Sequence, residues 1–396
     1  MMYDFETFQE RRPYNACKFL GIAEDVIPMS VADMDFPVPP EITQALHKRI
    51  DAANYGYTVL GDEDYQAVID WCFKRHGIRV KREELLATPG VLNTMRCSMY
   101  AMTVPGDKVV VVLPLHTPSI RSATMMGRVK CESRLVERTF GDYTFDFADL
   151  EKHFSAGAKV LMLCSPHNPT GRVWRREELE TLAQLVIKYD IRVVSDEIHR
   201  DLIFPGNKHI ELGTLPGMAE RTVTVFSASK TFNLGGCHIG SAVIRNPELR
   251  EKIRAKLYEF GHECGRPPVF SLAAQTAAYQ YGENYLNELL KYLKGNIDLA
   301  LSYLEGSPVS VRVPEASFLL WVDCRQLDLN TAQLNELFAR AGITADPGHY
   351  YDTFNIADYN GKQHHFRLAV AMPRPRLEKA MASLRRALEE CCNGKI

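Results

Sequence analysis

Three polar residues that each follow an apolar run are the residues best placed to do chemistry in this sequence. They are Asn168, Asp196 and Lys230, and the intervals between them are 28 and 34 residues. An amine held in a dry pocket loses the solvation of its charge, so its pKa falls and it becomes a nucleophile. A surface lysine at a strand end would have the same local sequence. The other residues of the chain must therefore distinguish a nucleophilic Lys230 from an ordinary surface lysine.

Two further features predict a phosphate site near this lysine. The hydroxyls of Ser227 and Ser229 stand three and one residues before Lys230 and form a candidate anion cradle. A Pro-Gly turn opens a helical pattern that runs to about residue 104, and free N–H groups at such a start favour a phosphate. Many helices begin this way with nothing bound. The candidate phosphate-binding backbone groups belong to Gly90, Val91 and Leu92. An amine beside a phosphate suggests pyridoxal 5'-phosphate (PLP) as cofactor.

The PLP hypothesis gives each residue a role. Lys230 forms the imine and later moves the proton of the substrate α-carbon. Asp196 keeps the pyridine nitrogen protonated, and such a pair at 4 Å is worth about 4 kcal/mol at an effective dielectric of 20. Asn168 donates to the ring hydroxyl oxygen and also lies beside the substrate, while His116 stacks on the ring. Arg367 either binds the substrate carboxylate with two parallel hydrogen bonds or forms a surface ion pair.

The elements around these residues predict an α/β domain. Apolar runs alternate with helical patterns, which argues for a largely parallel sheet. Ligands of such sheets lie beyond the carboxyl ends of the strands, where the polar residues stand. The expected strands are 109–113, 159–164, 191–195 and 222–226. The expected helices are 41–52, 62–76, 176–188, 248–262, 268–304, 331–341 and 375–391.

A proline-rich stretch, residues 28–40, cannot be a helix. Its four prolines and two aspartates force an extended path. It is either a linker or a loop that crosses a cleft and presents backbone groups to a ligand, and we expect Ala32 to contact the substrate. Residues 345–360, with His349 and Tyr359, are a second candidate for shaping the pocket.

Composition excludes several classes of function. The chain has 396 residues, of which 46% are hydrophobic and 24% charged, and its formal net charge is −2. This profile predicts a globular protein that binds neither nucleic acid nor membranes. The ten cysteines show no metal-ligand spacing, so no metal site is expected. The absence of a secretory signal and of a long apolar run predicts a cytoplasmic protein.

Together these motifs resemble the fold-type I PLP enzymes, the aspartate aminotransferase superfamily, from about Pro28 to the C-terminus. They are the Asn-Pro-x-Gly turn at 168–171, Asp196 in Ser-Asp-Glu-Ile-His, and Ser-x-Ser-Lys at 227–230. The resemblance implies a large domain with a mostly parallel mixed sheet flanked by helices, and a smaller α/β domain built from both chain ends. The implied division is an arm and part of the small domain at 1–48, the PLP-binding domain at 49–285, and the small C-terminal domain at 286–396.

The same resemblance implies a homodimer with shared active sites, in which Tyr57 reaches the phosphate of the neighbouring subunit's cofactor. Within the superfamily the chain resembles the MalY/PatB branch of cystathionine β-lyases and related C–S lyases. The similar stretches are 31–36, 166–172, 196–199 and 229–234. Aminotransferases usually carry tyrosine where His199 stands, and an arginine where His238 stands. The family's carboxylate arginine maps onto Arg367.

One position departs from the branch. Its members usually have tyrosine where this chain has His116 in Pro114-Leu115-His116. An imidazole there is expected to stack on the cofactor and to titrate near neutrality.

The resemblance implies β-elimination of an S-substituted L-cysteine such as cystathionine, giving thiol, pyruvate and ammonia. Three alternatives stay open. The first is an aminotransferase that uses the same residues, the second is a regulatory or binding protein with this fold, and the third is an α/β protein with no cofactor. No helix-turn-helix region or basic recognition segment is appended to the chain.

Overall fold

The computed structural model describes residues 3–124, 127–260, 266–352 and 361–393. Its larger sheet has seven strands in the order β2-β10-β9-β8-β7-β3-β4. Strand β10 is antiparallel to both of its neighbours, and the other pairs are parallel. The strands are β2 (Leu85–Thr88), β10 (Gly240–Ile244), β9 (Thr222–Phe226), β8 (Arg192–Asp196), β7 (Val160–Cys164), β3 (Lys108–Leu113) and β4 (Val129–Arg134). The mostly parallel mixed sheet confirms the predicted fold class.

Helices cover both faces of this sheet, and the side chains of β3 show why. Val109 and Val111 pack into one apolar cluster, whereas Val110 and Val112 pack into another on the opposite face. Burial on both faces therefore explains the unbroken apolar run of this strand. The first face is covered by α3 (Val91–Met102), α4 (Thr117–Thr124) and α8 (Pro247–Phe260), and the second by α5 (Phe147–Ser155) and α6 (Arg176–Lys188).

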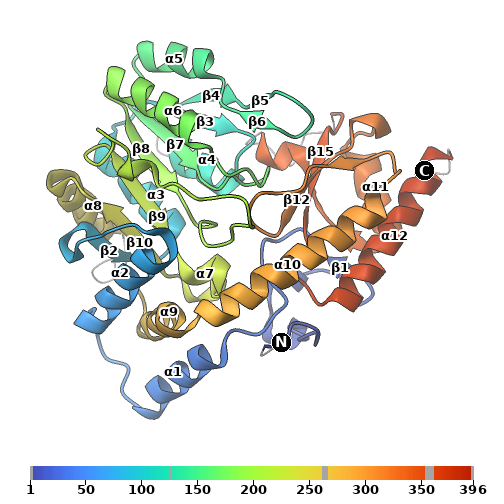
Figure 1. Ribbon diagram of the computed structural model, residues 1–396, viewed down its shortest axis with the longest axis horizontal. Helices are drawn as coiled ribbons and strands as arrows, with labels where there is room; N and C mark the ends of the chain where they lie inside the picture. Colours follow the sequence, from blue (N-terminus) through green and yellow to red (C-terminus); the bar gives the residue numbers. More distant parts are fainter. Residues whose placement is uncertain (1–2, 125–126, 261–265, 353–360, 394–396) are drawn as a thin grey trace.

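A second, four-stranded sheet lies toward the C-terminal end of the chain (Figure 1). Its order is β11-β12-β15-β14, and every pair is antiparallel. The strands are β11 (Ser310–Val311), β12 (Leu319–Asp323), β14 (Asp346–Pro347) and β15 (His365–Ala369). The helices α11 (Thr331–Ala341) and α12 (Arg374–Cys392) bury their apolar faces against β12 and β15. The N-terminal segment joins this region through β1 (Ile27–Pro28), which pairs in parallel with β13 (Ile343–Thr344).

Helix α10 (Glu283–Leu304) runs from the region of α9 (Val269–Tyr281) toward α11 and α12 (Figure 1). The sequence predicts one helix over 268–304, but the chain turns at Gly282 between two helices. A Cβ atom at Gly282 would lie 2.3 Å from Cε1 of Phe232, so only glycine fits this turn. Asn296 fixes α10 to the chain beside β15 by donating to the carbonyls of Val370 and Met372.

The remaining α-helices and strands are α1 (Pro40–Asp51) and α2 (Asp62–His76), which both pack against α9, the short α7 (Ala228–Thr231), and the hairpin of β5 (Val136–Glu137) and β6 (Tyr143–Thr144). Among the described residues, no helix combines the length and apolar character needed to cross a bilayer. The domain boundaries stated above stay a prediction.

Candidate active site

A cavity of about 400 Å³ opens beyond the carboxyl ends of the parallel strands. The end of β8 supplies Asp196, the turn after β7 supplies Asn168, and α7 after β9 supplies Lys230. The structure thus brings together the three residues that the strand spacing placed on one rim. The predicted site residues that line this cavity are Ala32, Gly90, Val91, Leu92, His116, Asn168, Asp196, His199, Ser229 and Lys230.

The amine of Lys230 points at the proline-rich N-terminal loop. Its Nζ donates a hydrogen bond to the carbonyl oxygen of Ala32 at 2.5 Å. Burial lowers the pKa of Lys230; the carboxylates of Asp33 and Asp196 oppose this effect, and the charge of Arg367 adds to it. The loop at 28–40 therefore closes over the lysine, and the linker alternative for it is wrong.

The carboxylate of Asp196 is buried at the end of β8. Burial raises the pKa of Asp196 to about 6, although the N–H of Ile198 donates to Oδ1 at 3.2 Å. No ion pair to this carboxylate is found among the described residues. A buried carboxylate is costly without a cationic partner, so this position suits a ligand with a protonated ring nitrogen.

The start of α3 forms the opposite end of the cavity. Gly90 has φ of +105°, a conformation that L-residues rarely adopt, and it turns the chain into the helix. On the other side, a Cβ atom at Gly240 would lie 2.9 Å from Oγ1 of Thr88 and 3.2 Å from N of Val91. The first residues of α3 line the cavity, and the N–H groups of a helix start, which have no partner within the helix, favour an anion there.

The two serines before the lysine differ in placement. Ser229 lines the cavity, but Ser227 is not among the lining residues. The Ser227 hydroxyl caps α7 by accepting from N of Ser229 at 3.0 Å, and it donates to the carbonyl of Ile239 at 2.6 Å. The structure therefore gives Ser227 a role in shaping the turn, and its predicted contact with a phosphate stays a prediction.

Sequence reasoning missed two polar residues that line the cavity, Asn93 and Arg96, and it noted His238, which also lines the cavity, only as a replacement for an arginine. Arg96 follows Leu92 by four residues on α3, so both lie on one face of the helix. This spacing could have predicted the role of Arg96, because a cation one turn after a helix start that binds an anion lies close to the same anion. Arg96 supplies a positive charge beside the start of α3, at a site where His238 replaces the usual arginine.

Two of the histidines that line the cavity, His116 and His199, are neutral. Burial, together with the charges of Arg367 and Lys230, lowers the pKa of His116 to about 3. The prediction that His116 titrates near neutrality is therefore wrong, because two cations face it in a dry pocket. Burial also lowers the pKa of His199 well below its usual range, and its Nδ1 lies 3.1 Å from Oγ of Ser317.

The segment after β14 packs against the turn that carries His116. The N–H of Leu115 donates to the carbonyl of Tyr351 at 2.7 Å, and Thr117 donates to the carbonyl of Tyr350. This segment thus holds the turn that carries His116, although none of its described residues lines the cavity. Residues 353–360, which include Tyr359, lie outside the described residues.

Arg367 lies on β15 and contacts Asn168. Its Nη1 donates to Oδ1 of Asn168 at 3.1 Å, and its Nη2 donates to the carbonyl of Ser30 and to Oδ2 of Asp346, each at 2.6 Å. Arg367 is 4% exposed, so the alternative of a surface ion pair is wrong. Tyr57, in contrast, lies outside the cavity with 89% of its surface exposed.

Comparison with known proteins agrees with this geometry. The family model of aminotransferase class I and II matches residues 24–384. Cystathionine beta-lyase PatB of Bacillus subtilis is 38% identical over 332 residues, which cover 83% of this chain and 85% of that protein. Protein MalY of Escherichia coli is 28% identical over 400 residues, 98% of this chain and 99% of that protein.

Solved structures give the same result. Cystalysin of Treponema denticola, solved with pyridoxal 5'-phosphate, superposes with a TM-score of 0.91 at 30% identity, covering 98% of this chain and 100% of that one. The PLP-bound C-S lyase of Staphylococcus hominis superposes with a TM-score of 0.88 at 29% identity, covering 98% of each chain.

The chain belongs to the aminotransferase class I and II family, the fold-type I enzymes that depend on PLP. Within that family it is a member of the MalY/PatB-like group of PLP-dependent carbon–sulfur lyases. The predicted family, fold and cofactor are confirmed.

Proposed function

We propose that this enzyme catalyses β-elimination from S-substituted L-cysteines such as cystathionine, releasing a thiol, pyruvate and ammonia. The observation that carries the proposal is the shared cavity of Lys230, the buried carboxylate of Asp196 and the start of α3. Bound there, PLP supplies an electron sink for the charge left on the substrate α-carbon. The names of the relatives support this choice of substrate class.

The chain's own residues divide the remaining work. The buried amine of Lys230 attaches the cofactor and, once released by substrate, its Nζ takes the α-proton. The carboxylate of Asp196 holds a proton on the ring nitrogen. Asn168 orients the ring hydroxyl oxygen, while the two neutral imidazoles of His116 and His199 pack beside the ring without adding charge.

The phosphate and the substrate carboxylate are held at opposite ends of this cavity. The N–H groups of Gly90, Val91 and Leu92, the hydroxyl of Ser229 and the cation of Arg96 hold the phosphate. Arg367 receives the substrate carboxylate beside Asn168, and the carbonyl of Ala32 faces the reacting amine.

We infer a homodimer in which the exposed Tyr57 contacts the cofactor phosphate of the neighbouring subunit. Its 89% exposure in one chain supports this role, because a large aromatic side chain gains from burial in an interface. We also propose 1–48, 49–285 and 286–396 as the domain division. Mixed dimers in which one subunit carries Tyr57→Phe and the other Lys230→Ala test the shared site. We expect them to match control dimers of one wild-type and one Lys230→Ala subunit, because an intact Lys230 and an intact Tyr57 still meet in one of the two sites. Activity well below that control would contradict the shared site.

Cystathionine added to the purified holoenzyme tests the proposed reaction. We expect pyruvate and free thiol to appear without any added keto acid. Strict dependence on a keto acid acceptor identifies an aminotransferase, and absence of turnover with any cysteine conjugate favours a regulatory or binding protein. A panel of conjugates that differ in the sulfur substituent then ranks the substrates.

A further inference from the structure

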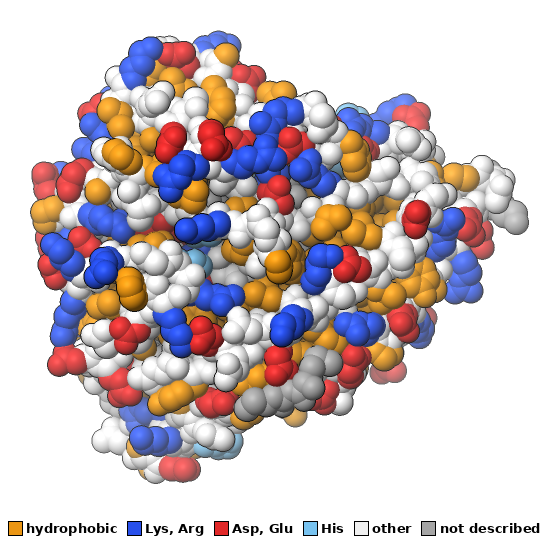
Figure 2. Space-filling view, in the orientation of Figure 1, with side chains coloured by type: hydrophobic (Ala, Val, Ile, Leu, Met, Phe, Trp, Pro, Cys, Tyr) orange, Lys and Arg blue, Asp and Glu red, His pale blue; other side chains and the backbone are white. Residues whose placement is uncertain are grey.

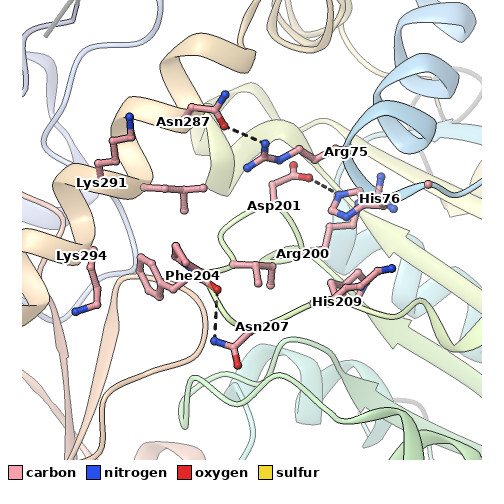
Figure 3. A pocket seen from close by; sticks show the side chains of 15 residues that line it. Arg75, His76, Arg200, Asp201, Phe204, Asn207, His209, Asn287, Lys291 and Lys294 are labelled. Atoms are coloured by element: carbon pink, nitrogen blue, oxygen red, sulfur yellow. Dashed lines mark hydrogen bonds and ion pairs between the residues drawn. The ribbon is translucent and has the colours of Figure 1, made fainter.

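A second and larger cavity, of about 960 Å³, lies outside the catalytic cavity. It is bounded by the end of α2, by the loop at 200–209 after β8, and by the middle of α10 (Figure 3). Nothing in the proposed reaction uses it. In the space-filling view, Lys and Arg side chains gather around a hollow near the middle of this face (Figure 2).

The lining of this cavity is strongly cationic. Five side chains that are always charged at neutral pH line it: Arg75, Arg200, Lys208, Lys291 and Lys294. Asp201 is the one carboxylate among the described lining residues. This excess contrasts with the formal net charge of −2 for the whole chain, so positive charge is concentrated here.

The carboxylate of Asp201 is already engaged. It accepts hydrogen bonds from Nε1 of Trp71 at 3.1 Å and from Oγ1 of Thr231 at 2.8 Å, and it lies 2.7 Å from Nε2 of His76. Burial lowers the pKa of His76 to about 4, so this ring is neutral. The charge of Asp201 is offset by that of the neighbouring Arg200, so this pair leaves the charges of the lysines on the other side of the cavity unmatched.

Lys208 and Lys291 are exposed, and neither has an ion-pair partner among the described residues. Arg75 donates only to the neutral amide of Asn287, at 3.0 Å, across the gap between α2 and α10 (Figure 3). Lys294 pairs with the carboxylate of Asp298. Cations from three separate segments thus converge on one space, and among the described residues no ion pair matches the charges of Arg75, Lys208 or Lys291.

Part of the wall is apolar. Ile203, Phe204, Pro205 and Leu290 line the cavity between the cationic side chains. Ligand pockets commonly have volumes of about 300–1,000 Å³ and combine apolar walls with a few charged groups. A cavity of 960 Å³ is far larger than a single inorganic ion needs.

We propose that this cavity binds a small organic anion that carries several negative charges beside an apolar part. The lysines and Arg75 bind the charges, and the wall around Phe204 covers the apolar part. The site is separate from the catalytic cavity, although the two share a wall: His199 lines one and Arg200 lines the other.

Calorimetric titration of the holoenzyme tests this site, because bound PLP keeps phosphate probes out of the catalytic cavity. The probes are ATP and citrate at constant ionic strength, with acetate as the singly charged control. We expect saturable binding of at least one probe, one per chain, and none of acetate. Binding of ATP alone assigns a phosphate ester, and binding of citrate alone assigns a polycarboxylate.

The variant Lys208→Gln/Lys291→Gln removes two exposed cations from the cavity, and we expect it to weaken binding by about tenfold or more. The matched control Lys152→Gln/Lys379→Gln removes two exposed lysines from α5 and α12, and we expect unchanged affinity. The proposal is overturned if no probe binds saturably, if the cavity variant binds as tightly as wild type, or if the control loses as much affinity.

Discussion

The guanidinium of Arg367 and the carboxylate of Asp346 form a buried ion pair, with Nη2 and Oδ2 2.6 Å apart, directly beside Asn168. Tyr351 donates to the same Oδ2 at 2.8 Å and holds the acid in place. Burial raises the pKa of Asp346, while the charge of Arg367 acts against this effect. A substrate carboxylate that reaches Arg367 must therefore share this cation with an acid of the chain itself.

We expect Asp346→Asn to lower KM for cystathionine about three- to tenfold, because the amide oxygen still accepts from Arg367 but no longer competes as an anion. Arg367→Gln should raise KM about ten- to hundredfold. Steady-state kinetics measure both. An increase in KM for Asp346→Asn would show that the acid positions Arg367 instead of competing for it.

Replacement of Lys230 by alanine removes the group that attaches the cofactor and moves the α-proton. We expect kcat to fall by about 10²–10⁴-fold or more, and the visible absorbance of the bound cofactor to change. Lys152→Ala, an exposed lysine on α5, is the matched control. Turnover and absorbance that both persist in Lys230→Ala would contradict the assigned site.

The buried carboxylate of Asp196 makes the stability of the cofactor-free protein depend on pH. Because burial raises the pKa of Asp196 from 3.8 to about 6, the folded state binds this proton more tightly than the unfolded state does. The free energy of unfolding therefore falls as pH rises between about 4 and 6, by about 3 kcal/mol in total.

Asp196→Asn should remove this penalty. We expect the cofactor-free variant to unfold at a higher temperature than wild type at pH 7, and at nearly the same temperature at about pH 3, where the wild-type carboxyl of Asp196 is mostly protonated in both the folded and the unfolded state. The same variant should bind PLP more weakly. Equal melting temperatures of wild type and Asp196→Asn at pH 7 would mean that the ionised carboxylate of Asp196 does not destabilise the folded protein.

Because burial and two nearby cations lower the pKa of His116 to about 3, this imidazole should not contribute to the pH profile of the reaction. We expect His116→Phe to change kcat while leaving the midpoints of the kcat/KM profile between about pH 5 and 9 in place. A limb that disappears in this variant would assign a titrating role to His116.

The turn that carries Asn168 depends on Gly171. Its φ is +70°, and a Cβ atom there would lie 2.7 Å from Cβ of Pro314. We expect Gly171→Ala to lower the free energy of unfolding by about 2–4 kcal/mol, from strain and overpacking together. Gly157→Ala is the control, since Gly157 has φ of +88° but no atom within 4 Å of that Cβ. Gly157→Ala should lower the free energy of unfolding by about 1–2 kcal/mol. Denaturant titrations measure both variants, and an equal decrease in the two would exclude a role for the Pro314 contact.

The parts of the fold that could be predicted are those with a strong local signal. The strands β3 and β7 are nearly continuous apolar runs, because both faces of each are buried, and β8 and β9 carry the apolar residues Val193, Val194, Val223, Val225 and Phe226. In contrast, β4 is an edge strand with polar, partly exposed residues, and β10 begins with Gly240 and Ser241, so neither has a clear strand signal.

The same distinction applies to the site. Asn168, Asp196 and Lys230 could be placed together because each follows a strand of one parallel sheet. The ion pair of Asp346 with Arg367 could not, because it arises where β14 and β15 pair as neighbouring strands. The neutral state of His116 likewise depends on cations that only the folded chain brings near it.

The contacts of Ser30 and Ala32 join the first part of the chain to residues that are made much later. Ser30 accepts from Arg367, 337 residues further on, and Ala32 accepts from Lys230, 198 residues further on. The contact of Ser30 with Arg367 cannot form until β15 has been synthesised. A chain truncated before β15 therefore lacks one of the two contacts that hold the N-terminal loop over Lys230.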